Sequence, residues 1–114
     1  MKEIKAYIRP VKLAEVLHHL ETAGARDISV IRVEGIGSLA DPRRDRKRWV
    51  RRRPETYSDV LKVEIVCRDG EADDLVGVLR EHAHTGARGD GRIFVSSVER
   101  AVNVRTGAEG EEAL

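Results

Sequence analysis

A strand–helix–strand pattern that occurs twice within 114 residues is the feature that most limits the folds open to this chain. From Glu3 to Arg9, apolar residues alternate with charged ones, which is the period of a half-buried strand. From Leu13 to Leu20, apolar residues recur at three- and four-residue spacing, as in an amphipathic helix that stops at Gly24. A second strand is expected from Ile28 to Glu34, which completes the first copy.

The second copy begins with a nearly continuous apolar strand from Val60 to Cys67. A helix is expected from Glu71, a glycine turn follows at Thr85 to Gly91, and a last strand runs from Arg92 to Val98. The order βαββαβ predicts a ferredoxin-like α+β sandwich, with an antiparallel sheet and both helices on one face. The length is that of one domain, residues 1–114. This fold alone does not identify a function.

Between the two copies, residues 36–59 show no periodic pattern and are predicted to form a long exposed loop. Its stretch from Asp41 to Arg53 has eight basic residues against two acidic ones, a net charge of +6, which leaves −5 for the rest of the chain. Ordering such a tract costs about 1–2 kcal/mol per residue and buries little apolar surface. We therefore expect residues 37–59 to be mobile until a ligand or partner binds them, as is typical of functional loops of this length.

The sequence argues against several classes of function. No apolar run approaches the roughly 20 residues of a membrane span, so we expect no membrane insertion and a cytoplasmic location. The single cysteine, Cys67, lies in an apolar run and is expected to be a buried thiol. Histidines 18, 19, 82 and 84 are expected on the surface without a metal, because such spacings do not place two ligands on one helical face. No nucleophile-and-base spacing is evident, so we expect no catalytic site and no enzyme.

The segment Thr85 to Val95 has the composition of an anion site. Three glycines within six residues expose backbone N–H groups, because no Cβ obstructs the approach of an anion. Arg88 and Arg92 add guanidinium groups that suit bidentate phosphate contacts. An ordinary glycine-rich turn remains the alternative if the glycines alone are considered.

Four segments together carry a resemblance to a known family. Thr85-Gly86-x-x-Gly89-Asp90-Gly91-Arg92-Ile93-Phe94-Val95 closely resembles the nucleotide-binding B-loop of PII signal proteins. Val104-Arg105-Thr106-Gly107-x-Glu109 is similar to the C-loop of that family, Ile8-Arg9-Pro10-x-Lys12-Leu13 to its first strand-to-helix junction, and Gly35-x-Gly37 to the start of its long T-loop. Outside residues 38–59, the resemblance covers essentially the whole chain.

The resemblance implies a homotrimer that binds ATP, ADP or AMP as effectors in clefts between subunits, with no catalytic cofactor. The T-loop would span residues 36–59, the B-loop 85–92 and the C-loop 103–110. Carried over by position, the nucleotide contacts fall into three groups. Phosphates and ribose would be held by Gly89, Asp90, Gly91 and Arg92 with Arg105 from the C-loop, loop backbone would come from Gly35 and Gly37, and Ser29, Glu64 and Val66 would surround the ribose and base.

Departures from the family pattern limit what can be carried over. Leu39 stands where nitrogen-sensing members have a glutamine that helps hold Mg²⁺ and 2-oxoglutarate, and Val60 stands where they have a lysine for the oxo-acid carboxylate. Asn103 replaces one of two C-loop arginines, and Tyr57 does not match the family's modified tyrosine. We therefore expect a divergent PII-like branch without 2-oxoglutarate sensing, with a small anion such as bicarbonate as a candidate second effector.

The basic loop suggests a partner. Its arginines and Trp49 suit nucleic acid, because cations neutralise phosphates and an aromatic ring stacks on bases. They equally suit an acidic protein surface or an anionic membrane face. The resemblance favours a regulated protein, a transporter or an enzyme. A basic nucleic-acid-binding module and a conventional nitrogen-regulatory PII protein remain the alternatives.

Overall fold

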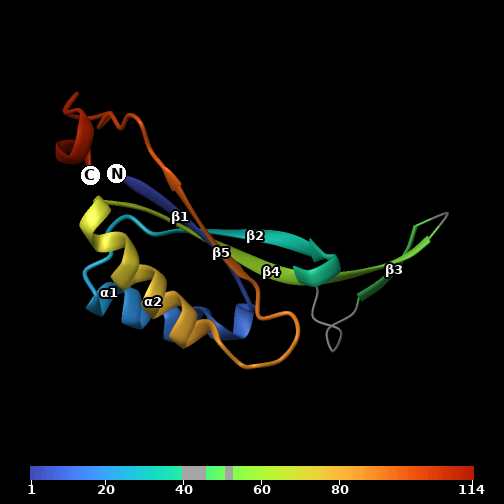
Figure 1. Cartoon of the computed structure of the whole chain (residues 1–114). Helices are drawn as coiled ribbons and strands as arrows, with labels where there is room; N and C mark the ends of the chain where they lie inside the picture. The colour runs from blue at the N-terminus through green and yellow to red at the C-terminus, as the bar shows by residue number, and fades with distance from the viewer. Residues whose placement is uncertain (40–45, 51–52) are drawn as a thin grey trace.

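The computed structural model describes residues 1–39, 46–50 and 53–114. It forms one antiparallel sheet in the order β2-β4-β1-β5, with β3 paired to β4, and both helices pack on the same face (Figure 1). The strands are β1 (Lys2–Ile8), β2 (Ser29–Ile36), β3 (Arg46–Val50), β4 (Arg53–Cys67) and β5 (Arg92–Ser97), and the helices are α1 (Leu13–Thr22) and α2 (Ala72–Ala83). The predicted ferredoxin-like fold is confirmed. None of the helices in these ranges is long and apolar enough to cross a bilayer.

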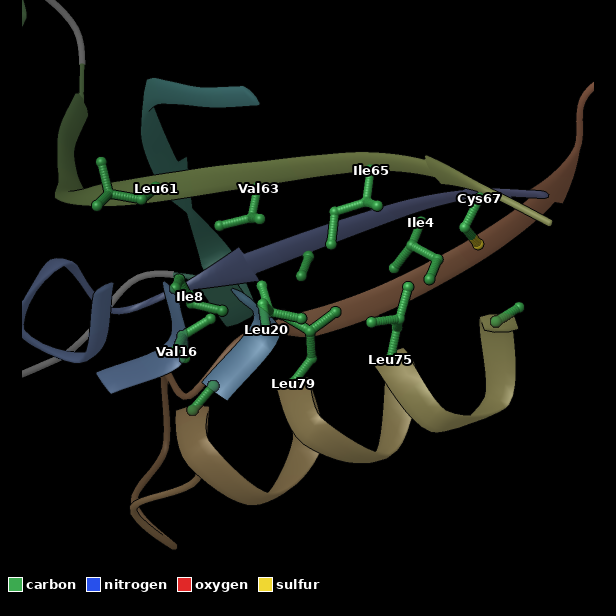
Figure 2. Packing of buried hydrophobic residues seen from close by; sticks show 13 residues of the cluster. Ile4, Ile8, Val16, Leu20, Leu61, Val63, Ile65, Cys67, Leu75 and Leu79 are labelled. Atoms are coloured by element: carbon green, nitrogen blue, oxygen red, sulfur yellow. The ribbon is translucent and has the colours of Figure 1, made fainter. Parts of the chain in front are cut away.

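The core lies between the sheet and the helices (Figure 2). Alternate residues of β1 and β4 point into it, as the period of two predicted. Its largest fully buried side chains are Ile4, Ile8, Val16, Leu20, Val63, Ile65 and Leu79. Full burial of each such side chain contributes about 1.5–3 kcal/mol, so this layer supplies most of the packing stability. Cys67 is buried at its edge as predicted, and the burial raises the pKa of the thiol.

The strand β4 begins earlier than the sequence predicts. It starts at Arg53 and not at Val60, and its first part pairs with β3 from Val50↔Arg53 to Arg46↔Tyr57. The two strands extend beyond the helices (Figure 1). An antiparallel pair there depends on backbone hydrogen bonds, so the sequence shows no hydrophobic period that would predict it. Residues 40–45 and 51–52 of the basic tract lie outside the described residues, so the mobility expected of the loop stays a prediction.

The face of the sheet opposite the helices carries both charged and apolar side chains. Phe94 is 52% exposed and Ile31 is 40% exposed there. The ring of Tyr7 meets that of Phe94 edge-on, with 6.1 Å between the ring centroids. A single chain therefore leaves large apolar side chains on the sheet open to water, which is typical of a surface that pairs with another molecule.

Candidate functional site

The loop between α2 and β5 is organised by one carboxylate. Asp90 Oδ2 accepts hydrogen bonds from the backbone N–H groups of Thr85 and Gly86, each at 2.8 Å. Asp90 Oδ1 accepts the hydroxyl of Thr85 and, at 2.9 Å, the Nε–H of Arg9. Burial acts to raise the pKa of Asp90, but these hydrogen bonds outweigh it and hold the pKa well below its ordinary value. Asp90 is therefore ionised at neutral pH and holds the loop in shape.

Arg9 connects this loop to the first strand. Its side chain is 6% exposed, and besides Asp90 it donates from Nη2 to the carbonyl oxygen of Arg88 at 2.8 Å. The two contacts lie 81 and 79 residues away in sequence. The sequence reading included Arg9 only within the strand-to-helix junction and did not identify this role, because nothing local indicates so distant a partner.

Gly91 lets the loop enter β5 in contact with β1. Its φ is +109°, and a Cβ there would lie 1.6 Å from the carbonyl oxygen of Tyr7, far closer than any real contact. Gly86 and Gly89 also have positive φ, so the loop turns through a backbone shape that L-residues rarely adopt. The result is a turn in which Gly86 and Arg88 are exposed residues, next to Arg92 at the start of β5.

The residues expected around ribose and base lie on neighbouring strands. Ser29 at the start of β2 pairs with Glu64 of β4, and Val66 lies two residues further along β4 on the same face. Lys62 Nζ donates a hydrogen bond to Glu64 Oε1 at 2.8 Å, and that bond holds the pKa of Glu64 below its ordinary value. The structure thus brings three predicted residues together at the β2–β4 side of the sheet.

The start of the long loop is closely packed at Gly35 and open at Gly37. Gly35 is buried in β2, and a Cβ at this glycine would lie 2.6 Å from Val60 Cγ2 and 3.0 Å from the carbonyl oxygen of Leu39. Gly37 is exposed with φ +73° and nothing within 4 Å of an added Cβ. Leu39 and Val60, the two replacements noted in the sequence, are therefore close neighbours of Gly35, and Val60 is 5% exposed.

Arg105 lies in a turn that Asn103 shapes. Asn103 Oδ1 accepts the backbone N–H groups of Arg105 at 3.0 Å and Thr106 at 3.1 Å, and its own carbonyl accepts Gly107 N–H at 2.8 Å. The sequence reading treated Asn103 as a lost positive charge. The structure shows that its amide oxygen instead satisfies two backbone donors of the turn, a task that an arginine side chain, which offers donors only, does not perform.

Arg105 and the Gly89–Arg92 turn lie at opposite ends of β1. The turn contacts Tyr7 at the C-terminal end of the strand, whereas the segment leading to Arg105 leaves β5 at Val98, whose N–H donates to the carbonyl oxygen of Met1. The C-terminus lies beside the N-terminus in Figure 1. Seven residues of strand separate these ends, or about 20 Å at a rise of about 3.3 Å per residue. Within one chain, the predicted phosphate ligands therefore form two separate groups.

Comparisons with known proteins identify the family of this chain. The profile of the family described as "Nitrogen regulatory protein P-II" matches residues 1–108. The chain is 40% identical over its whole length to "Nitrogen regulatory protein P-II 2" of Methanothermobacter thermautotrophicus, covering 97% of that protein, and 40% identical to "Nitrogen regulatory protein GlnK2" of Haloferax mediterranei, covering 91%. Among solved structures, GlnK of B. subtilis superimposes with a TM-score of 0.81 over 99% of this chain and 97% of that one, at 27% identity. The chain therefore belongs to the nitrogen regulatory protein P-II family.

Proposed function

We propose that this chain is a nitrogen-regulatory signalling protein that binds adenine nucleotides in clefts between the subunits of a homotrimer and controls a partner protein through residues 36–59. Proteins of this family are regulators and not enzymes, form trimers, and bind adenine nucleotides as effectors. The relatives named as nitrogen regulators cover the chain from end to end, which favours this regulatory class over a nucleic-acid-binding module.

The separation of the two groups of phosphate ligands along β1 is the observation that carries the proposal. A nucleotide on the Gly89–Arg92 turn of one chain cannot also contact Arg105 of that chain, because about 20 Å of strand lies between them. A neighbouring copy can supply Arg105 to the turn. The exposed Phe94 and Ile31 on the open face of the sheet give that copy an apolar surface to pack against.

The turn suits polyphosphate, because Gly89 has no side chain to obstruct an anion and the exposed Arg92 lies three residues further on. Several charge-assisted hydrogen bonds of about 1.5–3 kcal/mol each oppose the cost of immobilising the ligand, which corresponds to binding in the micromolar range. Val60 and Leu39 lie near Gly35, and neither side chain has a hydrogen-bond donor for an oxo-acid. We therefore propose nucleotide binding without enhancement by 2-oxoglutarate.

Calorimetric titration with ATP, ADP and AMP tests the site. We expect saturable binding by at least one nucleotide, a clear loss of affinity in Arg92→Ala and in Arg105→Ala, and little change in Arg100→Ala, an exposed arginine of the same C-terminal segment that pairs with Glu109. Bicarbonate is added in a separate titration as a candidate second effector. Failure of all three nucleotides to bind the intact protein would refute the site.

Sedimentation equilibrium tests the assembly independently of nucleotide. A mass of three chains at micromolar concentration is expected. Substitution of Phe94 by Glu places a charge on the open face and should weaken the association, whereas Glu99→Gln, at an exposed position just after β5, should not. A monomer at that concentration would contradict the inter-subunit cleft.

A further inference from the structure

Three potential metal ligands meet between the two helices, one of them exposed and two half-buried. Glu15 and His19 come from α1, and His82 comes from the last turn of α2. Each offers one ligand atom, and these atoms all lie within 4.8 Å of one another. The spacing of Glu15 and His19, four residues apart, places both on one helical face. The sequence reading considered His18 with His19 and His82 with His84 within single helices, and so missed a cluster made across two helices.

The ligand atoms of the cluster lie near one another, whereas the two imidazole rings stack and do not yet point at one ion. The rings of His19 and His82 stack with 3.5 Å between their centroids and 7° between their planes. His82 Nδ1 lies 3.1 Å from Glu15 Oε1. Ligands of a tetrahedral zinc ion at about 2.0–2.2 Å from the metal are about 3.3 Å apart. All three ligand atoms can therefore reach one ion if they close up from within 4.8 Å and the two rings turn out of their parallel stack.

Two charged side chains lie beside the proposed metal ligands. The other oxygen of Glu15 faces Lys12 Nζ at 3.3 Å. With Nδ1 of His82 on the metal, its Nε2 would be left for Glu81, whose Oε2 now lies 3.9 Å away and must move closer to form a hydrogen bond with the ring. Metal-bound histidines usually have such a carboxylate behind them.

From these contacts, we propose that Glu15, His19 and His82 form a binding site for a divalent transition metal, with Zn²⁺ as the reference ion, that joins α1 to α2. Two imidazoles and one carboxylate suit Zn²⁺, Cu²⁺ or Ni²⁺, whereas Mg²⁺ and Ca²⁺ prefer oxygen ligands alone. Three protein ligands leave the fourth position of a tetrahedral ion for water or another ligand. The site does not depend on the nucleotide assignment.

Competition with a chromogenic chelator measures Zn²⁺ binding to the tag-free full chain. We expect one Zn²⁺ per chain, and a loss of affinity of at least about tenfold in each of His19→Asn, His82→Asn and Glu15→Gln, since even the groups behind metal ligands contribute tenfold or more. His18→Asn is the matched control, because its ring touches His19 edge-on, with 5.1 Å between centroids, but lies outside the cluster. Its affinity should stay within about twofold of that of the unmodified chain, well short of the loss from a ligand.

A second readout separates binding from misfolding. Zn²⁺ should raise the Tm of the unmodified chain and of His18→Asn, but not that of His82→Asn or Glu15→Gln, because a ligand stabilises only the folded state that binds it. Circular dichroism without metal establishes that each variant is folded, and a variant that is not folded is replaced by another of the three. The absence of Zn²⁺ binding in the unmodified chain, or an equal loss in His18→Asn, would overturn the proposal.

Discussion

Replacing Asp90 by Ala should destabilise this protein strongly. The substitution removes the acceptor of two backbone N–H groups, one hydroxyl and the buried Arg9 guanidinium. Breaking a buried ion pair by removing one partner costs about 3–5 kcal/mol, and because the Asp90 side chain is 23% exposed we expect the lower end, about 3 kcal/mol. Asp90→Asn keeps one acceptor oxygen and should cost about half as much.

Urea unfolding followed by circular dichroism at one fixed protein concentration measures these costs, because association makes the midpoint concentration-dependent. Glu99→Gln, an exposed acid just beyond β5, is the control and should stay within about 0.5 kcal/mol of the unmodified chain. If the free energy of unfolding of Asp90→Ala also stays within about 0.5 kcal/mol of that of the unmodified chain, the Asp90 carboxylate does not hold the loop in shape.

The pH dependence gives an independent check. The pKa of Asp90 is depressed in the folded chain, so its contribution is complete above the unfolded-state pKa of about 3.9 and is lost as the pH falls below that value toward the folded-state pKa. The free energy of unfolding should therefore differ between the unmodified chain and Asp90→Asn by a constant amount above pH 5. Below pH 4 the difference should shrink.

Three further outcomes are expected. Gly91→Ala should destabilise the chain by more than about 2 kcal/mol in the same urea assay, because its Cβ would collide with the Tyr7 carbonyl at a positive φ; a neutral result would contradict the close approach of β5 to β1. Calorimetry should find the same ATP affinity with and without saturating 2-oxoglutarate, and mutual enhancement would show that Leu39 and Val60 do not occupy the proposed positions. Limited trypsin digestion should cut between Arg43 and Arg52, because the positive charges of this tract repel one another and resist compaction. Cleavage should slow when nucleotide binds. Equal cleavage rates with and without a bound nucleotide would contradict the proposed link between the site and the loop.

The sequence predicted those parts of the fold in which burial produces a period. The strand β1 and the helix α1 follow their apolar spacing, and Val16 and Leu20 are buried where the helical face requires. The pairing of β3 with β4 could not be predicted, because backbone hydrogen bonds leave no such period there. The cluster of Glu15 with His82 likewise depends on how α1 meets α2, which spacing within one helix does not reveal.

The placement of Arg92 and Arg105 at opposite ends of β1 has a genetic consequence. If each nucleotide lies between two copies, a chain with Arg92→Ala and a chain with Arg105→Ala are each inactive alone but carry complementary halves of the cleft. Unfolding and refolding an equal mixture should restore binding in roughly a quarter of the clefts, the fraction in which random assembly of a closed ring places an intact turn beside an intact arginine. Two defective alleles expressed together would then rescue each other, a behaviour that a site contained within one chain cannot produce.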